Sequence, residues 1–522
     1  MSRPGRLAYH RKESPPVSST RRQFLFQAAG ALAAGAGNPT PQFSCSNAKL
    51  QQAYDAAVTG LQGNVQSVFH FPRPVLLEGA TYAGVWLECA PLEGLIYAPL
   101  SPETALANHE VFFDLQREDG YLPCNVKKAG LGTGQIQMVV PIAATAWNLY
   151  RQNRSAAFLV KTYRACSRWD EWLVRYRNTR GSALCEAFCT YDTGQDNSPR
   201  FLGKSRQCPQ QDARICSPDD GLPYLAPDLS ATVYGGRIAL AAIAREMGRG
   251  SEESRWLESA AAIRKLILDR LYDARDAAFY DIDSHDRFVR IRGDAITRVM
   301  GEHVADRKLF DEVYRRQLHN PSAFRTPYPF PSIAADDPAF VRPIPRNSWG
   351  GASQALTALR TPRWMEHYGK YADFTHLMTR WVEALVRSGQ FLQQMDPDTG
   401  EFSPDRGAYS PAMLTLFDFV WRLYGVRPSG DTLEWNCRLP EDAASTTAQW
   451  GTAELRTDRT GSVLTLAGKQ IAKLRGSARI VTTSGGKPVR LIGTEPHAVT
   501  VLVQSGRSEK AHNLKPDSEI AL

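Results

Sequence analysis

Two carboxylic acids share one turn of the chain, and they are the residues best suited to proton transfer. Asp192 and Asp196 lie in the segment Tyr-Asp-Thr-Gly-Gln-Asp-Asn-Ser-Pro-Arg, residues 191–200. Two carboxyl groups crowded into one turn disfavour double ionisation, so the pKa of one can rise into the range of a general acid. The alternative is ordinary turn chemistry, because Asp and Asn side chains also bond to nearby backbone amides. From spacing alone, this structural interpretation is favoured.

The same segment resembles the signature of inverting glycoside hydrolases related to mannosylglycerate hydrolase, processing α-glucosidase and trehalase. The resemblance implies that Asp196, which precedes Asn-Ser-Pro, is the general acid, and that the fold is an (α/α)6 barrel. It covers roughly residues 70–426, with further family-like segments in the family's order at Tyr82–Glu88, Gln116–Pro123, Gln135 to Gln137, Asn347–Ser353, Phe391–Glu401 and Tyr409–Pro411.

The resemblance also implies which residues bind the sugar. Trp86 and Glu88 stand where the family has a substrate-contacting Trp-Asp pair. Aromatic rings in such loops stack on pyranose faces, although core packing is the alternative for each of them. Arginines such as Arg200 have the alternative of pairing with local acids. We expect the sugar pocket to be lined by Trp86, Glu88, Asp192, Asn197, Arg200, Trp349 and Gln393.

The position of the catalytic base departs from the family. The family has a Glu two residues after the Phe of the 391–401 loop, and this chain has Gln393 there. An amide does not accept a proton as a carboxylate does, whereas inversion needs two carboxyls flanking the sugar. Three explanations remain open: the protein binds sugar without hydrolysing it, the short loop is misaligned, or another carboxylate is the base. We name Glu401 as the base, with Asp405 and Glu88 as further candidates.

The elements that position these residues are mainly helices. Apolar residues at helical spacing predict helices over 233–247, 256–271 and 374–385. Further helices are expected at Glu103–Gln116, Pro141–Arg151, Ala156–Tyr176, Ile296–Gln317 and Pro411–Tyr424. Long loops rich in Gly, Pro, Asp and aromatic residues separate them, which indicates helical hairpins whose loops gather at one rim.

The pattern changes to short β-rich runs after Gly425, which predicts a small C-terminal β-sandwich domain. Strands are expected at Glu454–Thr457, Val463–Leu466, Ile471–Leu474, Arg479–Thr482, Val489–Ile492 and Val499–Val503. The expected domain layout is a signal peptide at 1–37, a linker and N-terminal segment at 38–69, a catalytic barrel at 70–426 and the β-sandwich at 427–522. Residues 38 to about 50 are the linker part.

The N-terminus has the layout of an export signal. Arg21 and Arg22 precede an apolar, Ala- and Gly-rich run from Phe24 to Ala34. The run is too short for a permanent membrane span, and the paired arginines resemble a twin-arginine signal. A chance arginine pair in an ordinary N-terminus is the alternative. We therefore expect transient contact with the twin-arginine export machinery and a periplasmic or secreted protein, with no stable membrane span.

The distribution of charged residues, histidines and cysteines argues against several classes of function. The net charge of +8 is scattered over 522 residues, so no basic stripe for nucleic acid is present. A sugar epimerase or lyase would need a His- or Tyr-centred base, and the ten histidines form no cluster in the sequence.

The nine cysteines leave at least one thiol unpaired, and one or two bridges are expected among Cys185, Cys189, Cys208 and Cys216. No zinc-binding spacing occurs, so we expect no metal and no cofactor.

Overall fold

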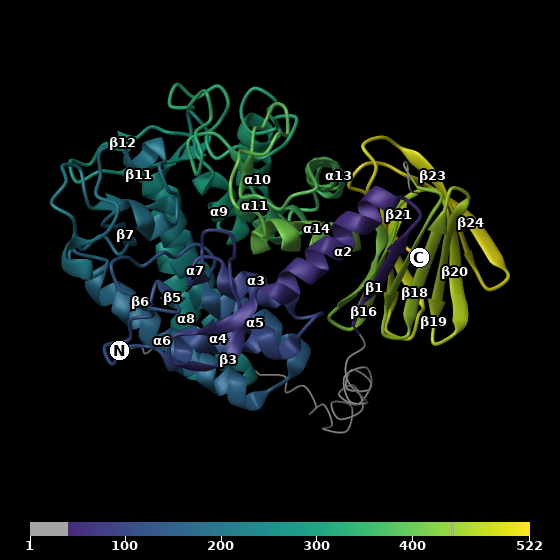
Figure 1. Ribbon diagram of the computed structural model, residues 1–522, viewed down its shortest axis with the longest axis horizontal. Coiled ribbons are helices and arrows are strands. Elements are labelled where there is room, and N and C mark those ends of the chain that lie inside the picture. Colours follow the sequence, from purple (N-terminus) through teal and green to yellow (C-terminus); the bar gives the residue numbers. More distant parts are fainter. Residues whose placement is uncertain (1–39, 440, 442) are drawn as a thin grey trace, which may run out of the picture. The chain divides into compact units, whose positions relative to one another are not determined.

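The computed structural model describes residues 40–439, 441 and 443–522. The predicted export signal at residues 1–37 lies outside this part of the chain. Within the described residues, no helix combines the length and the apolar character that a membrane crossing requires. The described chain is helical up to Tyr424, apart from short strands, and consists of strands after it (Figure 1).

The helices pack in consecutive pairs, which are α3 with α4, α5 with α6, α7 with α8 and α13 with α14. Alternate helices also touch, so that contacts run from α3 through α5, α7 and α9 to α12, and from α11 through α14 back to α3. The helices are α2 (Ala48–Gly63), α3 (Ala90–Tyr97), α4 (Pro102–Asp114), α5 (Ile142–Asn153), α6 (Ala156–Tyr176), α7 (Pro227–Glu246), α8 (Gly250–Leu266), α9 (Ala295–Gly301), α10 (Arg307–Val313), α11 (Ala355–Arg360), α12 (Pro362–Met365), α13 (Tyr371–Ser388) and α14 (Ser410–Tyr424).

Helix α13 shows why the spacing of apolar residues in the sequence predicts the positions of the helices. Its residues Phe374, Met378, Trp381 and Leu385 are all buried and fall three or four positions apart, on one face. The predicted helices at Ala156–Tyr176 and Pro411–Tyr424 are confirmed to within one residue at each end. The apolar face of each helix therefore sets its orientation toward the core.

Two expectations about the elements are wrong. The predicted helix Ile296–Gln317 is interrupted after α9, because Asp306 accepts a hydrogen bond from the backbone N–H of Leu309 at 2.9 Å and starts a new helix. The predicted linker before Leu50 contains strand β1 (Gln42–Cys45) and the start of α2, capped by the side chain of Asn47. A four-residue strand carries too short a pattern to be separated from a linker by sequence.

Short strands in the helical region hold the loops together. They are β2 (Val65–Val68), β3 (Phe71–Leu76), β4 (Gly84–Trp86), β5 (Asn125–Lys127), β6 (Gly130–Gly132), β7 (Glu186–Ala187), β8 (Tyr224–Leu225), β9 (Tyr272–Asp273), β10 (Ala278–Phe279), β11 (Asp281–Ile282), β12 (Phe288–Val289), β13 (Ser353–Gln354) and β14 (Gln394–Met395). Strand β4 ends at Trp86, and β13 pairs with β14 directly beside Gln393. These pairings bring loops that are distant in sequence to fixed relative positions.

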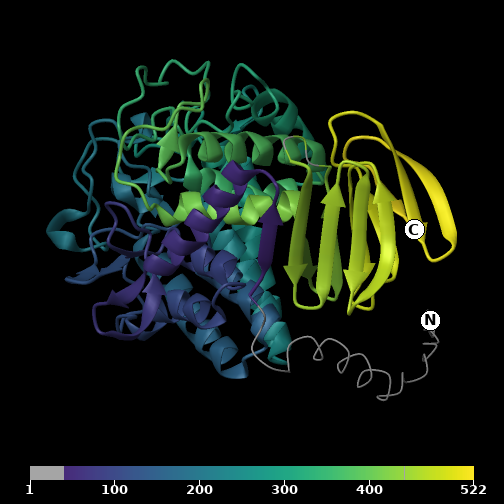
Figure 2. The ribbon, with the colours of Figure 1, turned by 45° about the vertical axis from the view of Figure 1, so that its right-hand side comes forward.

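The C-terminal strands form two antiparallel sheets. One has the order β1-β17-β18-β19-β20-β23-β24, and the other β15-β16-β21-β22-β25. Figure 2 shows the purple strand β1 at the edge of the larger sheet. The strands are β15 (Val426–Ser429), β16 (Thr432–Cys437), β17 (Ser445–Trp450), β18 (Ala453–Asp458), β19 (Gly461–Leu466), β20 (Lys469–Arg475), β21 (Ala478–Thr483), β22 (Pro488–Ile492), β23 (Val499–Ser505), β24 (Ser508–Leu514) and β25 (Glu519–Ala521), and they include all six predicted runs.

Residues from both sheets share one hydrophobic cluster, including Trp435 and Ile480 from one sheet and Leu455 and Leu474 from the other. Helix α14 contacts strands β15, β16 and β17, so the helical region and the sheets meet along this helix.

A buried ionic cluster lies at the same junction. Glu366, which follows α12, pairs with Arg422 of α14 at 2.7 Å and with Arg479 of β21 at 2.9 Å. These ion pairs connect the helices to the sheets.

Candidate active site

The turn that carries Asp196 begins with a short 3-10 helix, Thr190–Thr193, and ends with another at Pro199–Phe201. Gly194 between them has a φ of 65°, and a Cβ atom there would lie 1.8 Å from Oε2 of Glu88. Only glycine combines this left-handed conformation with such a close approach. Asn197 also has a positive φ, of 57°, which Asn tolerates better than most residues. The backbone of the turn that carries Asp196 therefore has a defined conformation, with Gly194 directly against Glu88.

Asp192 lies inside the protein and not in a sugar pocket. Its side chain has no exposed surface and forms an ion pair with Arg177, which is equally buried. Its carboxylate also accepts hydrogen bonds from the backbone N–H groups of Ile136 at 2.8 Å and Phe188 at 2.6 Å. With its lone pairs occupied in this way, Asp192 is a structural residue. The prediction that it binds substrate is wrong, and the turn-chemistry alternative holds for this residue.

Asp196 differs from Asp192 in being partly exposed. Its carboxylate accepts one hydrogen bond, from the side-chain amide of Asn347 at 3.2 Å. Burial raises the pKa of Asp196, while the bond from Asn347 and the positive charge of Arg206 act against this rise. A raised pKa keeps a carboxylic acid protonated at higher pH, which is the state a general acid needs.

Hydrogen bonds connect the turn that carries Asp196 to the segment 347–349. The backbone N–H of Trp349 donates to the carbonyl oxygen of Asp196 at 3.0 Å, and the side chain of Asn197 donates to the carbonyl oxygen of Asn347 at 2.7 Å. These bonds use backbone and amide groups, and among the described side chains only Asn347 forms a hydrogen bond with the Asp196 carboxylate. Asn197, predicted to bind substrate, thus has a bond that fixes the turn.

Gln393 lies on the far side of Asn347 from Asp196. Its amide N–H donates to the side-chain oxygen of Asn347 at 2.9 Å, and its oxygen accepts a hydrogen bond from the hydroxyl of Tyr82 at 3.2 Å. The structure therefore brings together Asp196 and Gln393, which are far apart in sequence, with one amide side chain between them.

Trp86 and Trp349 lie in one apolar cluster together with Cys89 and Leu356, and Tyr82 packs against it. The rings of Tyr82 and Trp86 meet edge to face at 5.5 Å. Trp86 keeps 8 % and Trp349 keeps 2 % of its surface exposed, so both predicted sugar-contacting tryptophans are largely packed. Their cluster forms an apolar wall next to Tyr82, which in turn bonds to Gln393.

Three buried glutamates interact with one another, and two of them, Glu78 and Glu88, also feel the charge of Asp196. Burial raises the pKa of Glu88 to about 7 and that of Glu93 to about 8. Burial and the negative charges of Glu93, Glu88 and Asp196 raise the pKa of Glu78 well above its usual value. Glu88 accepts a hydrogen bond from Gln137 at 2.9 Å, and Glu78 accepts one from Tyr409 at 2.8 Å.

Such a group of carboxyls with separated pKa values is typical of acid–base sites. Of the three, the sequence pointed only to Glu88.

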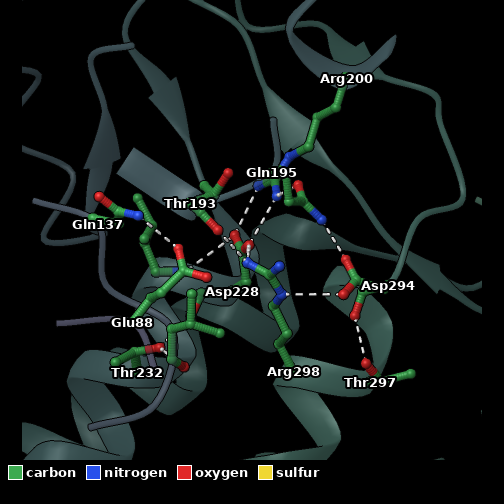
Figure 3. A network of polar contacts seen from close by, with 12 residues as sticks. Glu88, Gln137, Thr193, Gln195, Arg200, Asp228, Thr232, Asp294, Thr297 and Arg298 are labelled. Atoms are coloured by element: carbon green, nitrogen blue, oxygen red, sulfur yellow. Dashed lines mark hydrogen bonds and ion pairs between the residues drawn. The ribbon is translucent and has the colours of Figure 1, made fainter. Parts of the chain in front are cut away.

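Arg200, at the end of the turn that carries Asp196, is held by ion pairs with two acids from other segments. It is 6 % exposed and pairs with Asp228 at 2.7 Å and with Asp281 at 2.6 Å. These ion pairs are the alternative that the sequence offered for Arg200, and they engage the guanidinium that was predicted to contact substrate. Figure 3 shows Arg298 reaching toward Asp228 and Asp294 in the same network, in which the side chain of Gln195 also bonds to Arg200 at 2.9 Å.

This network fixes Gln195, the residue directly before Asp196. One of its partners, Arg200, belongs to the same motif, whereas the other, Asp294, is 99 positions away and could not be predicted from the motif.

Glu401, named as the base, is exposed at the end of a turn. Among the described residues it has no hydrogen bond or ion pair with the Asp196 turn. Asp405 pairs with Arg346 and is also not joined to Asp196. The contacts around Asp196 thus lead to Asn347, Gln393 and Tyr82, of which Asn347 and Tyr82 lie in family-like segments without having been singled out as site residues.

Comparisons with known proteins agree on the kind of protein. A search of curated protein sequences found no match. Among solved structures, mannosylglycerate hydrolase of family GH63 from Thermus thermophilus in complex with glucose is similar with a TM-score of 0.58 and 18 % identity, over 70 % of this chain and 99 % of that chain. Neutral trehalase Nth1 from Saccharomyces cerevisiae is similar with a TM-score of 0.52 and 12 % identity, over 66 % and 73 %.

A rhamnosidase of family GH78 from Bacillus sp. GL1 is similar with a TM-score of 0.54 and 12 % identity, over 84 % of this chain and 40 % of that chain. At these identities the likeness concerns the fold. The family itself follows from sequence, because the model of the mannosylglycerate hydrolase MGH1-like glycoside hydrolase domain matches residues 86–412, more than half of the chain. The chain therefore belongs to the mannosylglycerate hydrolase MGH1-like glycoside hydrolases and is a glycosidase, as its motifs predicted.

Proposed function

We propose that this glycosidase is an exported, exo-acting enzyme that cleaves a glycosidic bond with inversion, and that Asp196 is its general acid. The observation that carries the proposal is the position of Asp196: a partly exposed carboxyl with a raised pKa, held by Asn347 opposite Gln393. Protonation of the departing oxygen by such a group is the first half of an inverting hydrolysis. The substrate is an oligosaccharide or a small glycoside, and no metal or cofactor is required.

The second half needs a carboxylate that activates water on the other face of the sugar. Because Gln393 holds the family's base position, we assign this role to one of two buried glutamates, Glu78 or Glu88. The pKa of Glu88, about 7, suits a base that works near neutral pH. Glu78 lies on the Gln393 side, since Tyr409, which bonds to Glu78, has its ring 6.1 Å from that of Tyr82.

Three variants locate the base. Glu78→Gln and Glu88→Gln remove one carboxylate each, and the variant that loses its turnover by about 10²-fold or more identifies the base. Glu401→Gln is the matched control, because Glu401 is exposed at the end of its turn. If Glu401→Gln alone abolishes turnover, the base is the residue named from the sequence and our assignment fails.

The stereochemical outcome is measured on the same material. Purified protein is incubated with a panel of glycosides that includes mannosylglycerate, trehalose and rhamnosides, the sugars that the names of similar proteins suggest. Early ¹H NMR spectra then report the anomer that is released first. Release of the inverted anomer supports the proposal, and release of the retained anomer contradicts it.

We also propose that the helices form an (α/α)6 barrel and the C-terminal strands a β-sandwich domain, with boundaries near 70–426 and 427–522. Contacts that pass through alternate helices and return from α14 to α3 support the barrel. The hydrophobic cluster shared by the two C-terminal sheets supports the sandwich. In such a barrel the loops between helices carry the site, as the Asp196 and Gln393 loops do here.

Export through the twin-arginine machinery to the periplasm or beyond rests on Arg21, Arg22 and the apolar run that follows them. The test is cell fractionation of the full chain and of a variant in which both arginines are replaced by lysine. Export of the natural chain and retention of the variant are expected. Equal retention of both would contradict the proposal.

The second candidate function is sugar binding without hydrolysis, and Gln393 is the observation that favours it. The discriminating variant is Gln393→Glu. If the natural protein is inactive on the whole panel while the variant hydrolyses one member of it, the binding function is correct. Turnover by the natural protein that Asp196→Asn abolishes establishes the enzyme.

A further inference from the structure

Three cysteines converge behind the Asp196 turn. Cys189 and Cys208 lie with Phe188 in a small buried cluster, and Cys216 packs against it from a partly exposed position. The sulfur atoms of Cys189 and Cys208 are 3.7 Å apart, although the residues are 19 positions apart in sequence. Cys189 is the residue that precedes the 3-10 helix Thr190–Thr193, and so it is part of the support of Asp196.

The loop that brings in Cys208 is fixed from both ends. The backbone N–H of Cys208 donates to the carbonyl oxygen of Gly134 at 2.8 Å, and that of Thr190 donates to the carbonyl oxygen of Ser205 at 3.0 Å. Backbone hydrogen bonds therefore already align the two segments that carry the thiols. A rotation about the side-chain bonds is the movement required to bring the sulfurs from 3.7 Å to the ~2.05 Å of a covalent bond.

A metal ion does not explain the cluster. Cys189, Asp192 and Cys208 offer donor atoms within 4.8 Å of one another. The Asp192 carboxylate, however, is taken by Arg177 and by the backbone N–H groups of Ile136 and Phe188 described above. A guanidinium group at this position also repels a bound cation. The two sulfurs remain as reactive partners for each other.

Arg177 lies beside the pair, with its Nη2 atom 3.8 Å from the sulfur of Cys208. Burial opposes ionisation and raises the pKa of Cys189 well above its usual value. Because both thiols are buried once the chain has folded, an external disulfide reaches them before this segment has closed, and either cysteine can react with it first.

We propose that Cys189 and Cys208 form a disulfide bond that closes the Asp196 turn onto the 205–208 segment. The oxidant is an exchangeable disulfide, such as that of a thiol oxidase or of oxidised glutathione. One of the two cysteines attacks it as a thiolate, forms a mixed disulfide and releases one thiol. The other cysteine, also as a thiolate, then attacks the sulfur of the first and releases the second thiol. Two protons and two electrons leave the protein, and the oxidant is reduced to two thiols.

The disulfide bond would restrict the conformation of the segment that carries Asp196. Asp196 and Arg200 lie between the two cysteines in sequence, so the bond encloses the acid turn in a covalent ring. A ring of this size restricts the unfolded chain and stabilises the folded one. The sequence predicts one or two bridges among Cys185, Cys189, Cys208 and Cys216 without assigning a pairing, and the structure brings the sulfurs of Cys189 and Cys208 together. Export under the proposed function would supply the oxidising compartment.

The test uses the full chain refolded in a glutathione redox buffer, because both thiols are buried in the folded state. Alkylation under denaturing conditions followed by peptide mass mapping then reports which cysteines are bridged. A Cys189–Cys208 bridge, a mass lower by the two lost hydrogens and a Tm that falls by several degrees on reduction are the expected results. Nine alkylated cysteines after oxidation, or a bridge that involves Cys216 or Cys185, would overturn the proposal.

Two variants serve as controls. Cys216→Ser is expected to keep the bridge and the redox-dependent Tm, since Cys216 is only packed against the pair. Cys208→Ser is expected to remove both, with Cys189 then alkylated. A third measurement addresses metals: the reduced protein is dialysed against Zn²⁺ and its metal content determined. Stoichiometric zinc that Cys208→Ser abolishes would assign the thiols to a metal and overturn the proposal.

Discussion

The side-chain amide of Asn347 donates a hydrogen bond of 3.2 Å to the carboxylate of Asp196. The same side chain receives a bond from Gln393, so that it lies between the proposed acid and the residue at the family's base position. Donation to a carboxylate favours its ionised form. Asn347 therefore limits how far burial can raise the pKa of Asp196. Its side chain also connects Asp196 to Gln393 through two hydrogen bonds.

Asp196→Asn should remove the transferable proton while keeping the shape of the turn. We expect kcat to fall by about 10²–10⁴-fold. Stability should be nearly unchanged, because Trp349 bonds to the backbone oxygen of Asp196 and not to its side chain. The measurements are hydrolysis of an active glycoside and thermal unfolding. Retained turnover in a folded variant would rule out Asp196 as the acid.

Arg206→Gln should shift the pH dependence in a predictable direction. The positive charge of Arg206 lowers the pKa of Asp196, so its removal raises that pKa. The acid then stays protonated to higher pH, and the alkaline limb of the kcat/KM profile should move upward. Arg214→Gln is the control, because Arg214 pairs with Asp212 at the surface. An alkaline limb that stays in place or moves downward in Arg206→Gln would contradict this electrostatic coupling.

Asp192→Asn should destabilise the fold, in contrast to Asp196→Asn. Asp192 and Arg177 form an ion pair without exposed surface, and removing one partner leaves a buried charge uncompensated. We expect a loss of about 3–5 kcal/mol in the free energy of unfolding. Urea denaturation followed by tryptophan fluorescence measures it. The comparison is Asp212→Asn at the surface pair with Arg214, where a loss of about 1 kcal/mol or less is expected.

Glu366→Gln should reduce stability in a pH-dependent way. The positive charges of Arg422, Arg479 and Arg427 outweigh the opposing effect of burial and lower the pKa of Glu366 far below its usual value. A depressed pKa contributes stability above the unfolded-state value of about 4.5, and this contribution is lost as the pH falls toward the folded-state value.

We therefore expect the natural chain to exceed Glu366→Gln in unfolding free energy by about 3 kcal/mol at pH 7, and by less at pH 3. Denaturation curves at both pH values give the two differences. An equal difference at both would mean that the charge of Glu366 does not contribute through this cluster.

The sequence by itself determined most of the long helices and six of the C-terminal strands, because a helix or strand buries one face and repeats its apolar residues at a fixed interval. Trp381 and Leu385 of α13, for example, are buried as their spacing predicted. The motif around Asp196 likewise pointed to the family through its resemblance to known hydrolases, and the family model that matches residues 86–412 confirms it.

Only the tertiary structure separated the members of that motif from one another. Asp192 and Asp196 have the same chemistry and lie in one turn, yet Asp192 meets Arg177 in the interior while Asp196 stays partly exposed beside Asn347. Arg200 meets Asp281 from another loop, 81 positions away. Which partner a charge finds depends on chain segments that approach only after folding, and burial then decides whether that charge is structural or free to react.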